Sequence, residues 1–199
     1  MTAGLVFRLL RAGEGPLAKA LPEDLADAAT LGSERGAARL LRRRLLRSLT
    51  AEMLAVHPDR IRFERGETGR VQVVAPEPLF ASESGRGCWT ALALAPHPVG
   101  VDVETWPPQT PMPLDLLHPL ERDEILAAPD PGRTFLRFWT AREAWLKSDG
   151  RGFAVMPDQV RATAAEDGVG LDEGRAKGLA RIVEREDAIA AIVERGLGE

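Results

Sequence analysis

Apolar residues recur along the chain at two different spacings, which together predict a mixture of helices and strands. Between Ser33 and Val56, leucines and a methionine return at intervals of about four residues, as on one face of a helix, and Pro58 closes the segment. Further helices are predicted over residues 116–127 and 134–147. Short apolar or alternating runs between turn residues predict strands over residues 5–10, 61–64, 70–74, 89–95, 99–104, 160–164, 180–184 and 188–193.

Strand, helix and strand segments occur on both sides of Pro98. This order predicts an α+β fold made of two related halves, with residues 1–98 forming one and residues 99–199 the other. We expect any site that serves the whole chain to lie where the halves meet.

Composition narrows the class of protein without changing this picture. The 199 residues are 44% hydrophobic and 28% charged, with a net charge of -4, which is typical of a folded globular chain. No apolar stretch reaches the roughly 20 residues that cross a bilayer, and the acidic chain carries no nucleic-acid motif. A lone cysteine and an N-terminus without a signal-like pattern favour the cytoplasm.

Two carboxylates stand two positions apart in the predicted strand over residues 99–104. Asp102 and Glu104 alternate with valines, so both side chains leave the same face of the strand. Neighbouring carboxylates repel, and either the pKa of one rises or a cation sits between them. A pair of solvated residues at a strand end is the competing interpretation.

The helix over residues 134–147 adds a third carboxylate. Glu143 and Lys147 are four apart and project from one face, an arrangement that also occurs as an ordinary exposed ion pair. Three carboxylates without clustered histidine or cysteine suit Mg²⁺, which prefers oxygen ligands. The two segments together therefore favour a magnesium site.

The same residues carry a family resemblance. Gly100-Val101-Asp102-Val103-Glu104, followed after a long interval by Phe138 to Lys147 (FWTAREAWLK), resembles the paired motif of the 4′-phosphopantetheinyl transferase superfamily in its Sfp-type group. The segments Arg62 to Arg70 and Ser82-Glu83-Ser84-Gly85 resemble two further blocks of that family. The resemblance implies a pseudo-dimeric fold, two similar α+β halves in one chain with the active site between them, and a monomer.

The resemblance also implies an activity: transfer of 4′-phosphopantetheine from coenzyme A to a serine of an acyl, peptidyl or aryl carrier protein. By the family pattern Asp102, Glu104 and Glu143 would hold Mg²⁺, or Mn²⁺ in its place, against the pyrophosphate. Glu143, or a metal-bound water beside it, would take the proton of the incoming serine, and Lys147 would stabilise or protonate the leaving phosphate. Coenzyme A and an apo carrier protein are the implied partners.

Coenzyme A would be bound mainly by cationic residues. The residues that the resemblance or the helical stripe assigns to it are Arg39, Arg43, Gly69, Arg70, Ser82, Glu83 and Arg142. Arg39 and Arg43 belong to a predicted helix that holds six arginines and one glutamate between Ser33 and Thr50, and a solvated basic face is the equal alternative there.

Four positions, Phe80, Glu83, Val71 and Arg142, depart from the family pattern, and two of them bear on recognition of the 3′-phosphate. Glu83 stands where the family has a histidine near the 3′-phosphate of coenzyme A, and Phe80 replaces an asparagine. An acid there repels phosphate unless it is protonated, turned away or paired with an arginine. The alternative function is therefore a catalytically impaired relative that binds coenzyme A or a carrier protein as a module.

Overall fold

The computed structural model describes residues 4–66, 70–107, 112–150 and 155–196. Two five-stranded antiparallel sheets and four α-helices make up its regular structure in these ranges, so the predicted α+β class is confirmed. None of the helices described in these ranges is long and apolar enough to cross a lipid bilayer.

The first half of the chain runs strand, two helices, four strands. Its elements are β1 (Val6–Arg11), α1 (Pro22–Ala29), α2 (Ser33–Leu54), the short 3₁₀ helix η1 (Pro58–Arg60), β2 (Arg62–Arg65), β3 (Val71–Ala75), β4 (Leu79–Arg86) and β5 (Trp89–Ala95). The strands pair in the order β1-β5-β4-β3-β2.

The second half repeats this order of elements. They are β6 (Val99–Thr105), η2 (Leu114–Leu116), α3 (Pro119–Ala127), α4 (Pro131–Asp149), η4 (Pro157–Gln159), β7 (Arg161–Ala165), β8 (Gly168–Asp172), β9 (Lys177–Arg185) and β10 (Ala188–Glu194). Its strand order, β6-β10-β9-β8-β7, is the first sheet's order with each number raised by five. The predicted pseudo-dimeric fold is therefore confirmed. The chain passes from one sheet to the other between β5 and β6.

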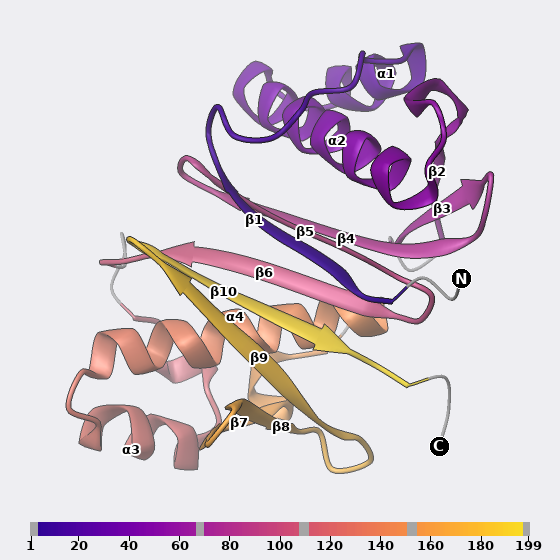
Figure 1. Ribbon diagram of the computed structural model, residues 1–199. Coiled ribbons are helices and arrows are strands. Elements are labelled where there is room, and N and C mark those ends of the chain that lie inside the picture. Colours follow the sequence, from indigo (N-terminus) through magenta and orange to yellow (C-terminus); the bar gives the residue numbers. More distant parts are fainter. Residues whose placement is uncertain (1–3, 67–69, 108–111, 151–154, 197–199) are drawn as a thin grey trace.

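The elements stack in four layers, with the two sheets inside and helices outside (Figure 1). Between the sheets, alanines of β5 meet valines of β6 and apolar residues of β10, and this small-residue interface lets the sheets approach closely. Leucines of α2 cover the outer face of the first sheet, and aromatic residues of α4 cover the second. Burial of these three apolar interfaces is the main favourable contribution to folding.

Gly100 fixes the position of α4 on β6. A Cβ atom at this position would lie 1.9 Å from the carbonyl oxygen of Ala144 and 2.5 Å from the backbone nitrogen of Ser148. The helix therefore lies directly on the strand, and no larger residue fits. This close approach brings the last turns of α4 beside the carboxylates that follow Gly100.

Candidate functional site

Alternation along β6 turns its carboxylates away from the intersheet core. Val99, Val101 and Val103 are buried between the sheets, which leaves Asp102 and Glu104 on the face that α4 covers. Asp102 is buried and Glu104 half-buried, which does not fit the competing interpretation of a solvated pair at a strand end.

Polar side chains from two other elements, α4 and β4, meet at Asp102 of β6. Its Oδ1 accepts hydrogen bonds from the Lys147 ammonium at 2.6 Å and from the Ser84 hydroxyl at 2.7 Å. The Lys147 ammonium also lies 3.1 Å from the Ser84 hydroxyl. The other carboxylate oxygen, Oδ2, is buried and has no hydrogen-bond partner among the described residues. A buried carboxylate oxygen in this state is available to a ligand.

The two other predicted carboxylates, Glu104 and Glu143, interact electrostatically with Asp102. Burial, followed by repulsion from Asp102, raises the pKa of Glu143. The same two causes raise the pKa of Glu104 to about 6, although the guanidinium of Arg86 lies 2.9 Å from it. The structure thus brings the β6 and α4 carboxylates into one electrostatic cluster. No group of three or more acidic, histidine or cysteine side chains in the described ranges is already arranged to hold a metal ion.

The raised pKa of Glu104 predicts a pH-dependent stability in metal-free protein. The folded pKa of Glu104, about 6, exceeds the unfolded value of 4.5. The contribution of protonated Glu104 to the unfolding free energy is therefore complete below about pH 4.5 and is lost as pH rises through 6. The quantity to measure, with chelator present, is the difference between the unfolding free energies of wild type and Glu104→Gln. This difference should fall by up to about 2 kcal/mol as the pH rises from 4.5 to 7.5. Urea unfolding at both pH values measures this difference, and a difference independent of pH contradicts the assignment. Glu52→Gln, at an exposed position on α2, is the control.

On the opposite face of β4, Glu83 is neutralised by an arginine. Arg39 of α2 places Nη1 2.6 Å from Glu83 and Nε 2.9 Å from Asp27 of α1. The side chain of Glu83 is only 5% exposed. An acid at this position avoids repelling phosphate if it is protonated, turned away or paired with an arginine. The structure contains the pairing with arginine.

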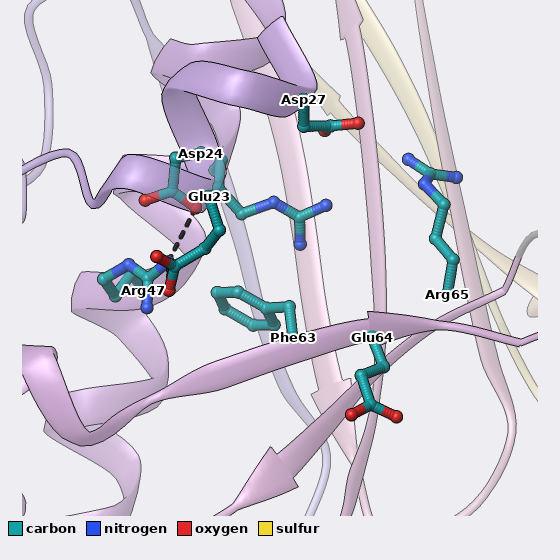
Figure 2. Close-up of a pocket in the computed structure, with 8 residues that line it drawn as sticks. Glu23, Asp24, Asp27, Arg47, Phe63, Glu64 and Arg65 are labelled. Carbon is teal, nitrogen blue, oxygen red and sulfur yellow. Dashed lines mark hydrogen bonds and ion pairs between the residues drawn. The ribbon is translucent and has the colours of Figure 1, made fainter.

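Arg43 and Arg47, one and two helical turns beyond Arg39, face inward instead of forming a solvated stripe. Their guanidinium groups lie 4.6 Å and 5.2 Å from the centre of the Phe63 ring. Arg47 is fully buried and binds Asp24 at 2.6 Å. Figure 2 shows this ion pair beside Phe63, at a cavity of about 200 Å³ between α1, α2 and β2. Acidic side chains of α1 line the same cavity, so this part of the predicted basic stripe is internally neutralised.

The remaining predicted nucleotide-binding residues lie in different settings. Arg70 donates to the Ser148 carbonyl oxygen at 2.8 Å, and burial lowers its pKa. It also borders a second pocket, of about 800 Å³, beside the end of α4. The Ser82 hydroxyl accepts from the backbone nitrogen of Val101 at 3.0 Å, which ties β4 to β6. Gly69 lies outside the described residues.

Arg142 points away from the carboxylate cluster. It is fully buried, binds Glu121 of α3 and donates from Nε to the Val160 carbonyl oxygen at 3.0 Å. Consecutive helical residues project about 100° apart, which separates Arg142 from Glu143 and Lys147. These contacts indicate that Arg142 joins α3 and α4 to the strand β7, and its predicted contact with coenzyme A stays a prediction.

Ser84 and Arg86 contact the carboxylates but were not among the predicted site residues. With Ser82 they occupy every second position of β4 and contact β6, whereas Glu83 contacts α2. The alternation of side chains in the sequence Ser-Glu-Ser-Gly-Arg could have predicted that Ser84 and Arg86 share one face of a strand with Ser82.

Comparison with known proteins agrees with this geometry. The family model of the 4′-phosphopantetheinyl transferase superfamily matches residues 98–187, which include Asp102, Glu104, Glu143 and Lys147. A 4′-phosphopantetheinyl transferase of Bacillus subtilis is 25% identical over 130 residues, 62% of this chain and 57% of the relative. The transferase Sfp of Bacillus subtilis strain 168 is 28% identical over 129 residues, with the same two coverages.

A third relative aligns over more of the chain. The transferase HetI of Nostoc sp. is 24% identical over 165 residues, 78% of this chain and 70% of the relative. The chain thus spans a little over half the length of the two Bacillus relatives. The family match over residues 98–187, these three similarities and the duplicated α+β architecture agree, and the chain is similar to the 4′-phosphopantetheinyl transferases.

Proposed function

We propose that this protein transfers the 4′-phosphopantetheine group of coenzyme A to a serine hydroxyl of a carrier protein and releases adenosine 3′,5′-bisphosphate. The observation that carries the proposal is the cluster at Asp102. The buried Asp102 and the half-buried Glu104 and Glu143 repel one another there, beside Lys147 and an oxygen of Asp102 that has no partner among the described residues. The three relatives are named as 4′-phosphopantetheinyl transferases, which supports the same reaction.

The cluster fits a divalent cation. Asp102 offers a buried oxygen, Oδ2, without a partner among the described residues, and burial followed by repulsion from Asp102 disfavours the charged forms of Glu104 and Glu143, so a cation among these carboxylates would stabilise them. Asp102, Glu104 and Glu143 would hold Mg²⁺, and the ion would neutralise charge on the pyrophosphate. Lys147 and Arg86 now neutralise two of the three acids, so metal binding would compete with these contacts.

The reaction then follows from the chain's own residues. Glu143 of α4, which lies in the same electrostatic cluster as Asp102, would accept the proton of the attacking serine hydroxyl. The serine oxygen forms a bond to the β-phosphorus of coenzyme A, and the bond from that phosphorus to the bridging oxygen breaks. The Lys147 ammonium lies beside Asp102 and is placed to stabilise the charge on the departing phosphate.

A direct assay tests the proposal. Wild-type protein is incubated with coenzyme A, Mg²⁺ and several apo carrier proteins, and the intact carriers are weighed by mass spectrometry. A gain in mass equal to phosphopantetheine, dependent on the metal, supports the proposal. Binding of coenzyme A without any such gain supports the alternative, a relative that acts as a binding module.

The ion pair between Glu83 and Arg39 predicts how a substitution at Glu83 changes the affinity for coenzyme A. Glu83→Gln removes an acid and releases Arg39 for phosphate, so the affinity for coenzyme A should rise about tenfold. Dephospho-coenzyme A, which lacks the 3′-phosphate, should bind both proteins equally. Isothermal titration calorimetry measures both ligands, with Glu64→Gln, at an exposed position on β2, as the control. Weaker binding of coenzyme A by Glu83→Gln would mean that the ion pair positions Arg39 for the ligand instead.

A further inference from the structure

The acids of the cluster at Asp102 differ in how they are neutralised. Asp102 itself is held by two groups, because its Oδ1 accepts from the Lys147 ammonium at 2.6 Å and from the Ser84 hydroxyl at 2.7 Å. Among the described residues, Glu104 forms its ion pair with Arg86 alone, whose Nε lies 2.9 Å from Oε2 of the carboxylate. Arg86 therefore decides how much negative charge Glu104 presents to a cation.

The contact between Arg86 and Glu104 is one that can be exchanged. The Nε–H of Arg86 is not aligned with a hydrogen-bond acceptor in the described part of the chain, so charge, and not a directed hydrogen bond, joins it to Glu104. Arg86 is the last residue of β4, directly before the hairpin turn to β5, and its side chain is 40% exposed. The guanidinium can therefore move into water without becoming a buried, unpaired charge.

The charges of the cluster show what this arginine does to a metal ion. With Asp102, Glu104 and Glu143 ionised, the acids carry three negative charges, and Lys147 and Arg86 supply two positive ones. A divalent cation added to this net charge of -1 leaves an excess of +1 in a partly buried site, which is unfavourable. The phosphates of a bound donor would remove that excess. Without Arg86 the net charge is -2, which a divalent cation matches by itself.

We propose that Arg86 couples metal binding to donor binding: it holds Glu104 in the metal-free protein and weakens the site for a divalent cation until the phosphates of the donor are bound. The inference rests on the proposed transferase function and assigns a positioning role to a residue outside the predicted site. Arg86 acts through Glu104 and needs no contact with the reacting atoms.

Metal binding in the absence of turnover tests this role. Mn²⁺ is titrated at pH 7.5 and the free ion is measured by electron paramagnetic resonance. The neutral variants Arg86→Gln and Arg86→Ala should bind Mn²⁺ alone about tenfold more tightly than wild type, because they leave Glu104 unpaired. Arg86→Lys keeps the positive charge and should stay closer to wild type. Arg60→Gln removes a positive charge from an exposed position of η1 and should bind like wild type.

The coupling between the two ligands is a second measurement. Coenzyme A should raise the Mn²⁺ affinity of wild type by a larger factor than that of Arg86→Gln, and linkage requires Mn²⁺ to raise the coenzyme A affinity of each protein by the same factor. Structural damage would lower the metal affinity and does not produce the expected gain. Unchanged or weaker binding of Mn²⁺ by both neutral variants overturns the assignment of Arg86.

The inference and the proposed function fail in different ways. If wild type transfers phosphopantetheine while both neutral variants bind Mn²⁺ no more tightly than wild type, the function stands and the role of Arg86 is overturned. If the neutral variants bind Mn²⁺ more tightly but wild type modifies no carrier, the proposed function is overturned and Arg86 remains the residue that weakens the metal site.

Discussion

Glu143→Gln is expected to slow transfer of phosphopantetheine by about 1,000-fold, within the range for loss of a general base. The variant loses both the proton acceptor and a negative ligand for the proposed metal, while its shape is kept. Because burial, followed by repulsion from Asp102, disfavours the charged form of Glu143, the neutral amide should not lower the free energy of unfolding. Rates come from mass spectra of the carrier over time, and stability from urea unfolding.

The combination of lost activity and kept stability is the informative result. Glu52→Gln removes an exposed carboxylate from α2 and should leave both quantities unchanged. Activity of Glu143→Gln within tenfold of wild type would remove Glu143 from the chemistry and direct attention to Asp102. The affinity for coenzyme A, measured without metal, separates a defect in chemistry from one in donor binding.

Local patterns were sufficient to predict the centre of the site. Alternation placed Asp102 and Glu104 on one face, and helical spacing placed Glu143 beside Lys147. Both are properties of the chain over a few residues, and Gly100 then brings strand and helix together. Most predicted helices and strands are present for the same reason, since their apolar faces are visible in sequence.

β4 was missed because its site-facing positions are polar. Its middle reads Ser-Glu-Ser-Gly-Arg, which is typical of a turn, and a strand with few apolar residues gives little periodic signal. The strand forms because β5 pairs with it from Phe80 to Arg86, which is all but its first residue. Tertiary pairing therefore overrides local preference where the chain presents Ser84 and Arg86 to the carboxylates.

Charge pairing across elements was also beyond the sequence. Six arginines on α2 look alike in a helical projection, and only the placement of α1 and β4 decides which of them are neutralised. Arg39 and Arg47 find acids on those elements, whereas Arg42 meets the glycine of β4. A basic stripe in sequence is thus a poor guide to which cations remain available to a ligand.

The ion pair between Arg142 and Glu121 should dominate the stability of the second half. Both side chains are fully buried, and Glu121 also accepts a hydrogen bond from the Ala162 backbone nitrogen. Burial raises the pKa of Glu121 and lowers that of Arg142 although each faces the opposite charge, so desolvation of the pair is costly. Removing one partner leaves the other charge buried alone. Arg142→Ala should therefore lower the unfolding free energy by about 3–5 kcal/mol, measured by urea unfolding.

A double substitution separates this structural role from the predicted contact with coenzyme A. Arg142→Met combined with Glu121→Leu removes both charges and should recover much of the stability lost in either single variant, as for other buried pairs replaced by apolar residues. Arg122→Ala, at an exposed position of α3, should change stability by less than about 0.5 kcal/mol. If Arg142 only joins α3, α4 and β7, the double variant binds coenzyme A like wild type. A stable double variant with weakened binding would instead place the guanidinium on the donor, because the apolar pair restores packing but not charge.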